Sequence, residues 1–245
     1  MSLSSRAATA NRPASNPPSR NRLLAALPRA ERARLTAVGK PVELVFGEVL
    51  CEPGARLRHV YFPGEGFISD IAAAGDHAML EVGLIGSEGM HGIAVALGVN
   101  VSAQRSLVQG AGSALRVRAA AFRRELERSP ALRRILDRYA FVLMTQLAQN
   151  ALCISVHRVE QRLARWLLMS HDRAHADAFY VTHAFLANML GVRRVGVTEA
   201  AGVLQRKKLI RYARGRVEVV NRRGLEAAAC RCYRADRETW RRLLG

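Results

Sequence analysis

Two residues in the middle of the chain have the types and the spacing of a nucleophile and its base. Cys153 and His157 stand four residues apart on or near an expected helix, so a thiol could meet an imidazole. Nothing near them in the sequence supplies an oxyanion hole or a substrate pocket, and both fall at an expected hinge. The sequence therefore predicts no enzyme, and no catalytic residue is assigned.

Metal binding is the second chemistry to consider, and the spacing does not favour it. The cysteines are Cys51, Cys153, Cys230 and Cys232, scattered as in a chain that is kept reduced. Cys230 and Cys232 fall two apart on a helix expected over 222–244, so their side chains would point to different sides unless it unwinds. Three histidines of the N-terminal half form no spaced set either: His59, His77 and His91. No metal site and no disulfide framework are expected.

The residues from Thr182 to Ile210 indicate recognition of nucleic acid instead. Apolar residues recur there at helical spacing, first at Phe185, Leu186, Met189 and Leu190 and then at Val197, Ala200, Ala201 and Leu204. Thr182 is placed to cap the first helix, and Gly191 supplies the positive φ that ends it. The pattern predicts a helix-turn-helix, with an ordinary helical hairpin as the alternative.

Basic residues surround this pattern. A hairpin with a turn around Arg214, Gly215 and Arg216 follows the second helix and reads as a wing. From Thr182 to the C-terminus there are 15 basic and 5 acidic residues, a net charge of +10, against 19 and 15 over 23–181. The charge is concentrated where phosphates would be contacted. Nucleic acid is thus the favoured partner of a chain with net charge +18, and an anionic membrane surface is the weaker alternative.

Taken in order, these motifs resemble the Crp/Fnr family of bacterial transcription regulators. The resemblance covers about Leu35 to Cys232 and includes a glycine-punctuated β-roll, a long helix and a winged helix-turn-helix. It implies a cyclic-nucleotide-binding-like fold and a homodimer whose recognition helices enter successive major grooves of a roughly palindromic site in double-stranded DNA. It also implies RNA polymerase as a further partner.

The resemblance assigns DNA contacts residue by residue. Base contacts are expected from Arg194 to guanine, Val195 to a thymine methyl and Glu199 to cytosine, although an ion pair with a neighbouring arginine is open for Glu199. The expected phosphate contacts are Thr182, His183, Arg193, Thr198, Lys207, Arg214 and Arg216. Of the three positions that read bases in the family's best-known member, only Arg194 has the same residue type. The DNA half-site of that member is therefore not expected.

The same comparison leaves the sensor's ligand open. The stretch from Gly86 to Ser106 matches the family's phosphate cassette, and Arg105 and Ser106 fit its Arg-Ser pair as effector-binding residues. The positions that would hold the ribose and the base are apolar, namely Ile93, Leu147 and Ala148. Tight binding of cyclic AMP is therefore not expected. Arg105 would hold another anion or pair with an acid of the roll.

These residues must be positioned by an α+β chain of several parts. Residues 1–22 are basic and read as a disordered tail, and two short helices follow, the second starting at Pro28. Short strand-like pieces between Val42 and Val117, separated by turns such as Pro63-Gly64 and at Gly110, predict a β-roll within a sensor domain over 23–128.

The second half is expected to be mainly helical. A dimerisation helix is expected over 129–155, with one apolar face formed by Leu132, Leu136, Tyr139, Leu143, Leu147, Ala151 and Ile154. The DNA-binding domain would then occupy 156–245. No run of 18 apolar residues and no signal peptide are seen, so a cytoplasmic protein is expected. A binder of nucleic acid through charge alone, without sequence preference, remains the alternative function.

Overall fold

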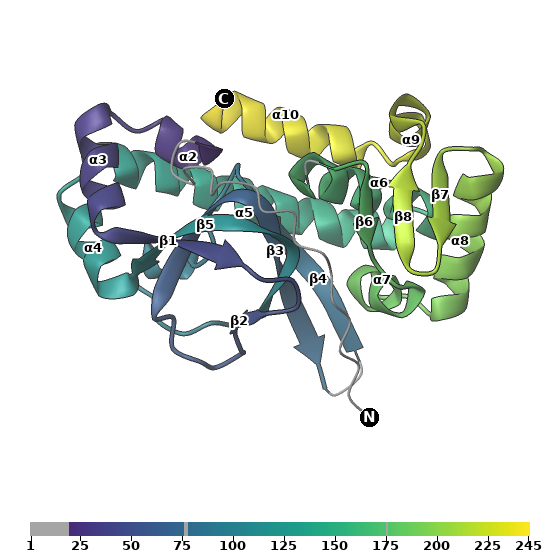
Figure 1. The fold of residues 1–245 in the computed structure, drawn as a ribbon, viewed down its shortest axis with the longest axis horizontal. Helices are drawn as coiled ribbons and strands as arrows, with labels where there is room; N and C mark the ends of the chain where they lie inside the picture. Colours follow the sequence, from purple (N-terminus) through teal and green to yellow (C-terminus); the bar gives the residue numbers. More distant parts are fainter. Residues whose placement is uncertain (1–19, 76–77, 175) are drawn as a thin grey trace.

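The computed structural model describes residues 20–75, 78–174 and 176–245. Figure 1 shows an antiparallel roll at one end and a helix-turn-helix unit at the other, with one long helix passing behind both. Most of the tail expected over 1–22, and His77, lie outside the described residues. The mixed architecture confirms the expected α+β class.

The roll is a five-stranded antiparallel sheet. Its strands are β1 (Gly39–Leu44), β2 (Val49–Cys51), β3 (His59–Ala74), β4 (Ala78–Ile85) and β5 (Arg105–Arg118). They follow the order β1-β5-β3-β4, and β2 also pairs with β5. The roll core is apolar and includes Val60, Phe62, Leu115 and Val117, all without exposed surface. A 3-10 turn, η1 (Ile93–Val95), lies within the long connection from β4 to β5.

Two of the expected turns are wrong, because the strands continue through them. β3 runs through Pro63-Gly64, and β5 runs through Gly110. The β3-β5 register shifts between Pro63 and Glu65, between Glu65 and Phe67 and between Phe67 and Ile68. A Cβ on Gly110 would lie 2.3 Å from the Phe67 ring. Gly110, together with Gly66 and Gly112, allows the two bulged strands to approach closely and does not end the strand.

The N-terminal helices are α2 (Arg22–Ala25) and α3 (Arg29–Ala37). Asn21 is fully buried, caps α2 and donates from Nδ2 to the carbonyls of Pro63 and Gly89 at 2.9 and 2.8 Å. The expected tail therefore does not extend to residue 22, because Asn21 anchors the chain on the roll. Pro28 is the N-cap of α3, so the helix begins at Arg29, one position later than expected.

After β5 come the short helix α4 (Ala119–Glu127) and the long helix α5 (Pro130–Val156). As expected, Ser129 caps α5 by accepting from the Leu132 amide at 3.1 Å, and Pro130 takes the first turn. The expected apolar face is divided, however. Its first three members, Leu132, Leu136 and Tyr139, are buried in the roll of their own chain, and the large apolar residues that α5 exposes begin at Phe141.

By length and composition α5 is apolar enough to cross a membrane, with a mean hydropathy of 1.3 over 18 residues, of which 17% are buried. Core helices of soluble domains can have the same length and hydropathy. Because Leu132 and Leu136 pack inside the roll, this helix is a component of the folded chain.

The C-terminal part is helical with a small sheet. It comprises α6 (Val159–Ala174), β6 (Ala178–Tyr180), α7 (His183–Leu190), α8 (Arg194–Arg206), β7 (Ile210–Ala213), β8 (Arg216–Val219), α9 (Arg222–Ala228) and α10 (Cys232–Leu244). The helix expected over 222–244 is thus two helices. Ala229 has extended dihedrals, φ −71° and ψ 154°, which end α9 and turn the chain before α10. α10 then packs along α5, as Figure 1 shows.

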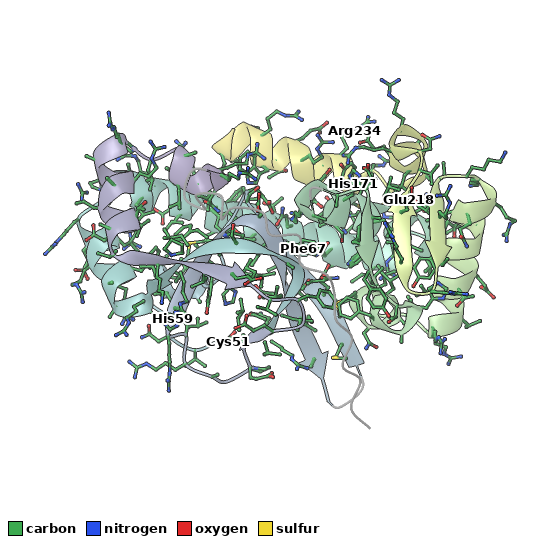
Figure 2. All side chains as sticks on the ribbon, in the orientation of Figure 1. Cys51, His59, Phe67, His171, Glu218 and Arg234 are labelled. Carbon is green, nitrogen blue, oxygen red and sulfur yellow. The ribbon has the colours of Figure 1, made fainter. Side chains whose placement is uncertain are left out.

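The roll and the helix-turn-helix domain share one apolar core. Phe67, Ile71 and Leu84 of the roll pack with residues of α6 and α7, and Figure 2 places Phe67 at this junction. Glu81 of β4 lies there too, accepting from Ser69 Oγ at 2.7 Å and from Trp166 Nε1 at 2.9 Å. As a residue Glu81 is only partly buried, but its carboxylate is enclosed, and this burial raises its pKa to about 7.

This carboxylate makes the junction sensitive to pH. The folded chain holds the Glu81 proton more tightly than the unfolded chain, so the free energy of unfolding falls as pH rises from about 4.5 to about 7. The pKa of about 7 against 4.5 corresponds to about 3 kcal/mol. Glu81→Gln should remove that decline. We expect urea unfolding at pH 5 and pH 8 to show the variant gaining stability over the wild type at the higher pH.

The matched control is Glu43→Gln, an exposed carboxylate on β1. It should follow the wild type at both pH values. Equal pH dependence in wild type and Glu81→Gln would show that this carboxyl is not the titrating group.

Candidate nucleic-acid interface

The helix-turn-helix is formed by α7 and α8, as expected. Thr182 Oγ1 accepts from the Phe185 amide at 3.1 Å and so caps α7. Gly191 ends α7 with φ 61° and ψ 44°, and its amide donates to the Asn188 carbonyl. Arg193 is the N-cap of α8, so the turn between the helices is only three residues long. A left-handed residue at this point lets the chain reverse without a longer loop.

The face of α8 that meets the protein is apolar, and its other face is open to solvent. Its buried residues are Val197, Ala200, Ala201 and Leu204. Five predicted DNA-contacting residues are exposed on or just before its first turns, Arg193, Arg194, Val195, Thr198 and Glu199, and Val195 is 60% exposed. Among the ion pairs of the described residues, none involves Glu199, so the alternative ion pair with an arginine is absent there.

A small polar cluster ties α7, α8 and the wing together. Thr198 Oγ1 lies 3.0 Å from His183 Nδ1, and the His183 ring stacks on Tyr212 with centroids 4.5 Å apart. Tyr212 in turn donates from its hydroxyl to the Val181 carbonyl at 2.5 Å. Burial, followed by the nearby Arg194 charge, lowers the pKa of His183. A neutral His183 would meet a phosphate through a hydrogen bond and not as a cation.

The wing is a three-stranded sheet of order β6-β8-β7. Its tight turn consists of Arg214 and Gly215, with φ 50° and 80°, and Ala213 pairs with Arg216 across it. Two positive φ values are the geometry of a hairpin turn that matches the twist of its strands. Arg216 therefore belongs to β8 and not to the turn. Both arginines are exposed at the tip of the wing.

The structure brings some predicted residues together and leaves others apart. Thr198 contacts His183 next to the cap Thr182 at the start of α7, whereas Lys207 is the exposed C-cap of α8. Sequence reasoning missed Tyr212 and Gln205, which position the wing: Gln205 Oε1 accepts from the Tyr212 amide at 2.8 Å. An aromatic residue in a predicted wing strand was the only available signal for this contact.

The predicted effector pair of the roll is already engaged with acids. Arg105 Nε lies 3.4 Å from Glu52 Oε1, so the expected ion pair with an acid of the roll is the alternative found. Ser106 is buried, and its hydroxyl donates to Asp70 Oδ1 at 2.7 Å. Asp70 also lies 3.5 Å from His91 Nδ1. A carboxylate beside Ser106 repels an anionic ligand, which argues against a phosphate at this pair.

The comparisons with known proteins agree with this geometry. Residues 161–228 match the model of the Crp-like helix-turn-helix domain. A Crp/Fnr-family transcriptional regulator from Eubacterium rectale is similar in structure, with TM-score 0.66 and 13% identity over 84% of this chain and 96% of that chain. No curated protein sequence matches the chain.

Two further solved structures have the same fold. The c-di-GMP-responsive global regulator CLP from Xanthomonas campestris has TM-score 0.65 and 16% identity, covering 78% of this chain and 99% of that chain. FixK2 from Bradyrhizobium japonicum has TM-score 0.66 and 14% identity, covering 79% and 98%. At such identities the likeness establishes the fold.

The α7-α8 pair, the wing and the family match define a Crp-like helix-turn-helix domain for DNA binding. Joined to a roll and a long helix, this domain gives the chain the fold of the Crp/Fnr structures.

The turn at Gly191 can be tested by stability. Gly191→Ala places a Cβ at φ 61° and 3.1 Å from Leu80 Cδ1, so we expect a loss of about 1–2 kcal/mol in the free energy of unfolding. Gly196→Ala is the matched control, because Gly196 lies within α8 with open space around it, and alanine should stabilise the helix by about 1 kcal/mol. Chemical unfolding measures both, and a neutral Gly191→Ala would contradict the strained turn.

Proposed function

We propose that the chain binds a specific, roughly palindromic DNA site as a homodimer and regulates transcription there. The observation that carries the proposal is the open face of α8, where residues able to read bases stand exposed beside a basic wing. We divide the chain into a roll sensor domain over 23–128, a dimer helix over 129–155 and a DNA-binding domain over 156–245.

Base reading falls to the first turn and a half of α8. Arg194 would donate to guanine, Val195 would contact a thymine methyl, and Glu199, which has no ion-pair partner among the described residues, would accept from cytosine. Phosphate contacts fall to the surrounding positions, Thr182, His183, Arg193, Thr198, Lys207, Arg214 and Arg216. The contact of Thr198 with His183 supports a common orientation of α7 and α8 on the duplex.

The dimer seam is the part of α5 from Phe141 onwards. Phe141 and Met144 are 54% and 66% exposed, and they continue at heptad spacing through Ala148, Ala151 and Ser155. Apolar residues flank this line at Leu147 and Leu152. A parallel partner helix would cover this face, since three- and four-residue spacing is the pattern of a helix-helix seam. Small residues at its C-terminal end would allow close approach next to the DNA-binding domains.

The roll relays a signal that is not a tightly bound cyclic nucleotide. The ion pair of Arg105 with Glu52 and the bond from Ser106 to Asp70 support this, because a phosphate would have to displace both acids. A change in the roll would reach the DNA-binding domain through α5 and through the shared core around Phe67 and Glu81. RNA polymerase is the further partner that we propose at a promoter.

Selection of bound duplexes from a random pool, at near-physiological salt, tests the proposal. We expect a two-fold symmetric motif with half-sites about 10 bp apart, without added cyclic AMP. Arg194→Ala should weaken binding to the selected site by about 1–3 kcal/mol and relax one base position in each half-site. The control is Arg29→Ala, which removes an equal charge from an exposed position on α3, far from α8.

Binding through charge alone predicts the opposite pattern. No motif would emerge, and Arg194→Ala and wing variants would only lower the salt slope by about 0.9 for each lost phosphate contact. A motif that appears only with cyclic AMP would contradict our assignment of the roll.

The seam is tested by Phe141→Glu combined with Met144→Glu. Charges on this face should give a monomer in sedimentation velocity, because two carboxylates would be buried without partners in the dimer. Phe46→Glu serves as control, since Phe46 is also 54% exposed but lies in a turn of the roll. A wild-type monomer, or a double variant that stays dimeric, would refute the seam.

A further inference from the structure

Four side chains with metal-binding atoms meet where α5 ends. Cys153 lies on the last turns of α5, His157 is the residue that caps it, Cys230 lies between α9 and α10, and Cys232 begins α10. The four ligand atoms all lie within 4.8 Å of one another. The expectation that these cysteines would stay apart was wrong. The chain breaks at Ala229, so Cys230 and Cys232 are not on one helix and both turn towards Cys153.

The measured separations fit a tetrahedral zinc ion. Zn–S bonds of about 2.3 Å and Zn–N bonds of about 2.0–2.1 Å place two sulfurs about 3.8 Å apart and a sulfur and a nitrogen about 3.6 Å apart. Here Cys153 Sγ lies 3.5 Å from Cys230 Sγ, and Cys232 Sγ lies 3.6 Å from His157 Nδ1. Three cysteines and one histidine are a common ligand set of structural zinc sites.

The surroundings also suit a metal thiolate centre. All three cysteines are buried, and His157 is half-buried beside a groove lined by Leu152, Val156 and the start of α10, which gives a path for an ion. Gln149 Nε2 donates to Cys232 Sγ at 3.0 Å, a bond of the kind that orients a metal ligand. Zinc with three thiolates and a neutral imidazole carries one negative charge, and the Arg165 guanidinium lies within electrostatic reach of Cys153 and Cys230.

We propose that Cys153, His157, Cys230 and Cys232 bind one Zn²⁺. The thiols that are protonated release their protons to solvent as the Zn–S bonds form, so no oxidant or reductant takes part. The site joins the end of the long helix and its hinge to the segment that follows the winged domain. A bound ion would therefore hold α10 against α5 and fix the direction in which the chain leaves the dimer helix towards α6.

The alternative to a metal site is a disulfide, which would involve only two of the four groups. A bond between Cys153 and Cys230 would require the two sulfurs to move from 3.5 Å to about 2.05 Å. It would also leave Cys232 and His157, which contact each other, without a role. The tetrahedral set uses all four groups, and we therefore commit to the metal.

The full chain is purified under reducing conditions in the presence of zinc, and free zinc is then removed by gel filtration. The experiment measures the metal that remains bound. We expect about one zinc per chain, as for a closed four-ligand site. Replacement by Co²⁺ should give the visible bands of a tetrahedral ion and sulfur-to-cobalt charge transfer. Cys230→Ser and Cys232→Ser should lose most of the bound zinc. Cys51→Ser is the matched control, a buried cysteine of β2 that Figure 2 places in the roll.

A milder variant keeps the test valid if the serine variants fail to fold. Gln149→Ala removes only the donor to Cys232 and should weaken zinc binding by about 10–100-fold. Absence of zinc from the reduced wild type, equal zinc content in Cys230→Ser, an octahedral Co²⁺ spectrum or an iron-sulfur chromophore would each overturn the proposal. The readout needs no DNA, so a failed zinc site and a failed DNA-binding function are distinguished.

Discussion

The structure depends on one helix, α5, which connects the roll to the C-terminal domain. α5 is held at its start by the Ser129 cap and by Leu132, Leu136 and Tyr139, which are buried in the roll. Its second half still contacts the roll through Asn150, which donates to the Val82 carbonyl at 3.3 Å. The helix ends at His157, whose extended dihedrals, φ −107° and ψ 144°, turn the chain into α6. In the proposed function, this helix would carry a small change in the roll to the DNA-binding domain.

A second path between the two ends is direct packing. The shared core around Phe67, Trp166 and Leu84 fixes the helix-turn-helix domain on its own roll in this conformation, with Glu81 as the buried polar group between them. Around it, Arg173 pairs with Glu88 at 2.7 Å and Arg165 pairs with Asp236 at 2.6 Å, both largely buried. Removing one partner of either pair would leave an uncompensated charge that is largely buried.

The two residues of the roll that were expected to bind an effector lie beside acids of their own chain. Asp70 accepts from Ser106 and lies beside His91, and Glu52 faces Arg105. Among these groups the Ser106 hydroxyl is hydrogen-bonded, whereas His91 Nδ1 and Arg105 Nε lie near acids without a hydrogen bond. Fold and ligand are decided at different levels, since backbone topology follows from strand pairing and ligand choice from a few side chains.

The sequence alone determined the parts that local rules control. The caps at Ser129 and Thr182, the left-handed Gly191 and the apolar spacing of α8 are short-range signals, and each one is found where it was predicted. Local rules also located the wing and the concentration of basic charge. The DNA-contacting roles and the dimer remain predictions that these features support.

Only the tertiary structure decided which groups from distant parts of the chain meet. Pro63-Gly64 and Gly110 read as turns, because sequence cannot show that two bulged strands need glycines for close approach. The sequence could not show which residues of the apolar face of α5 are buried by the roll and which are exposed, because helical spacing does not predict what packs against a residue. The break at Ala229 likewise turns Cys230 towards Cys153, 77 residues away, and such a contact follows only from how α10 packs on α5.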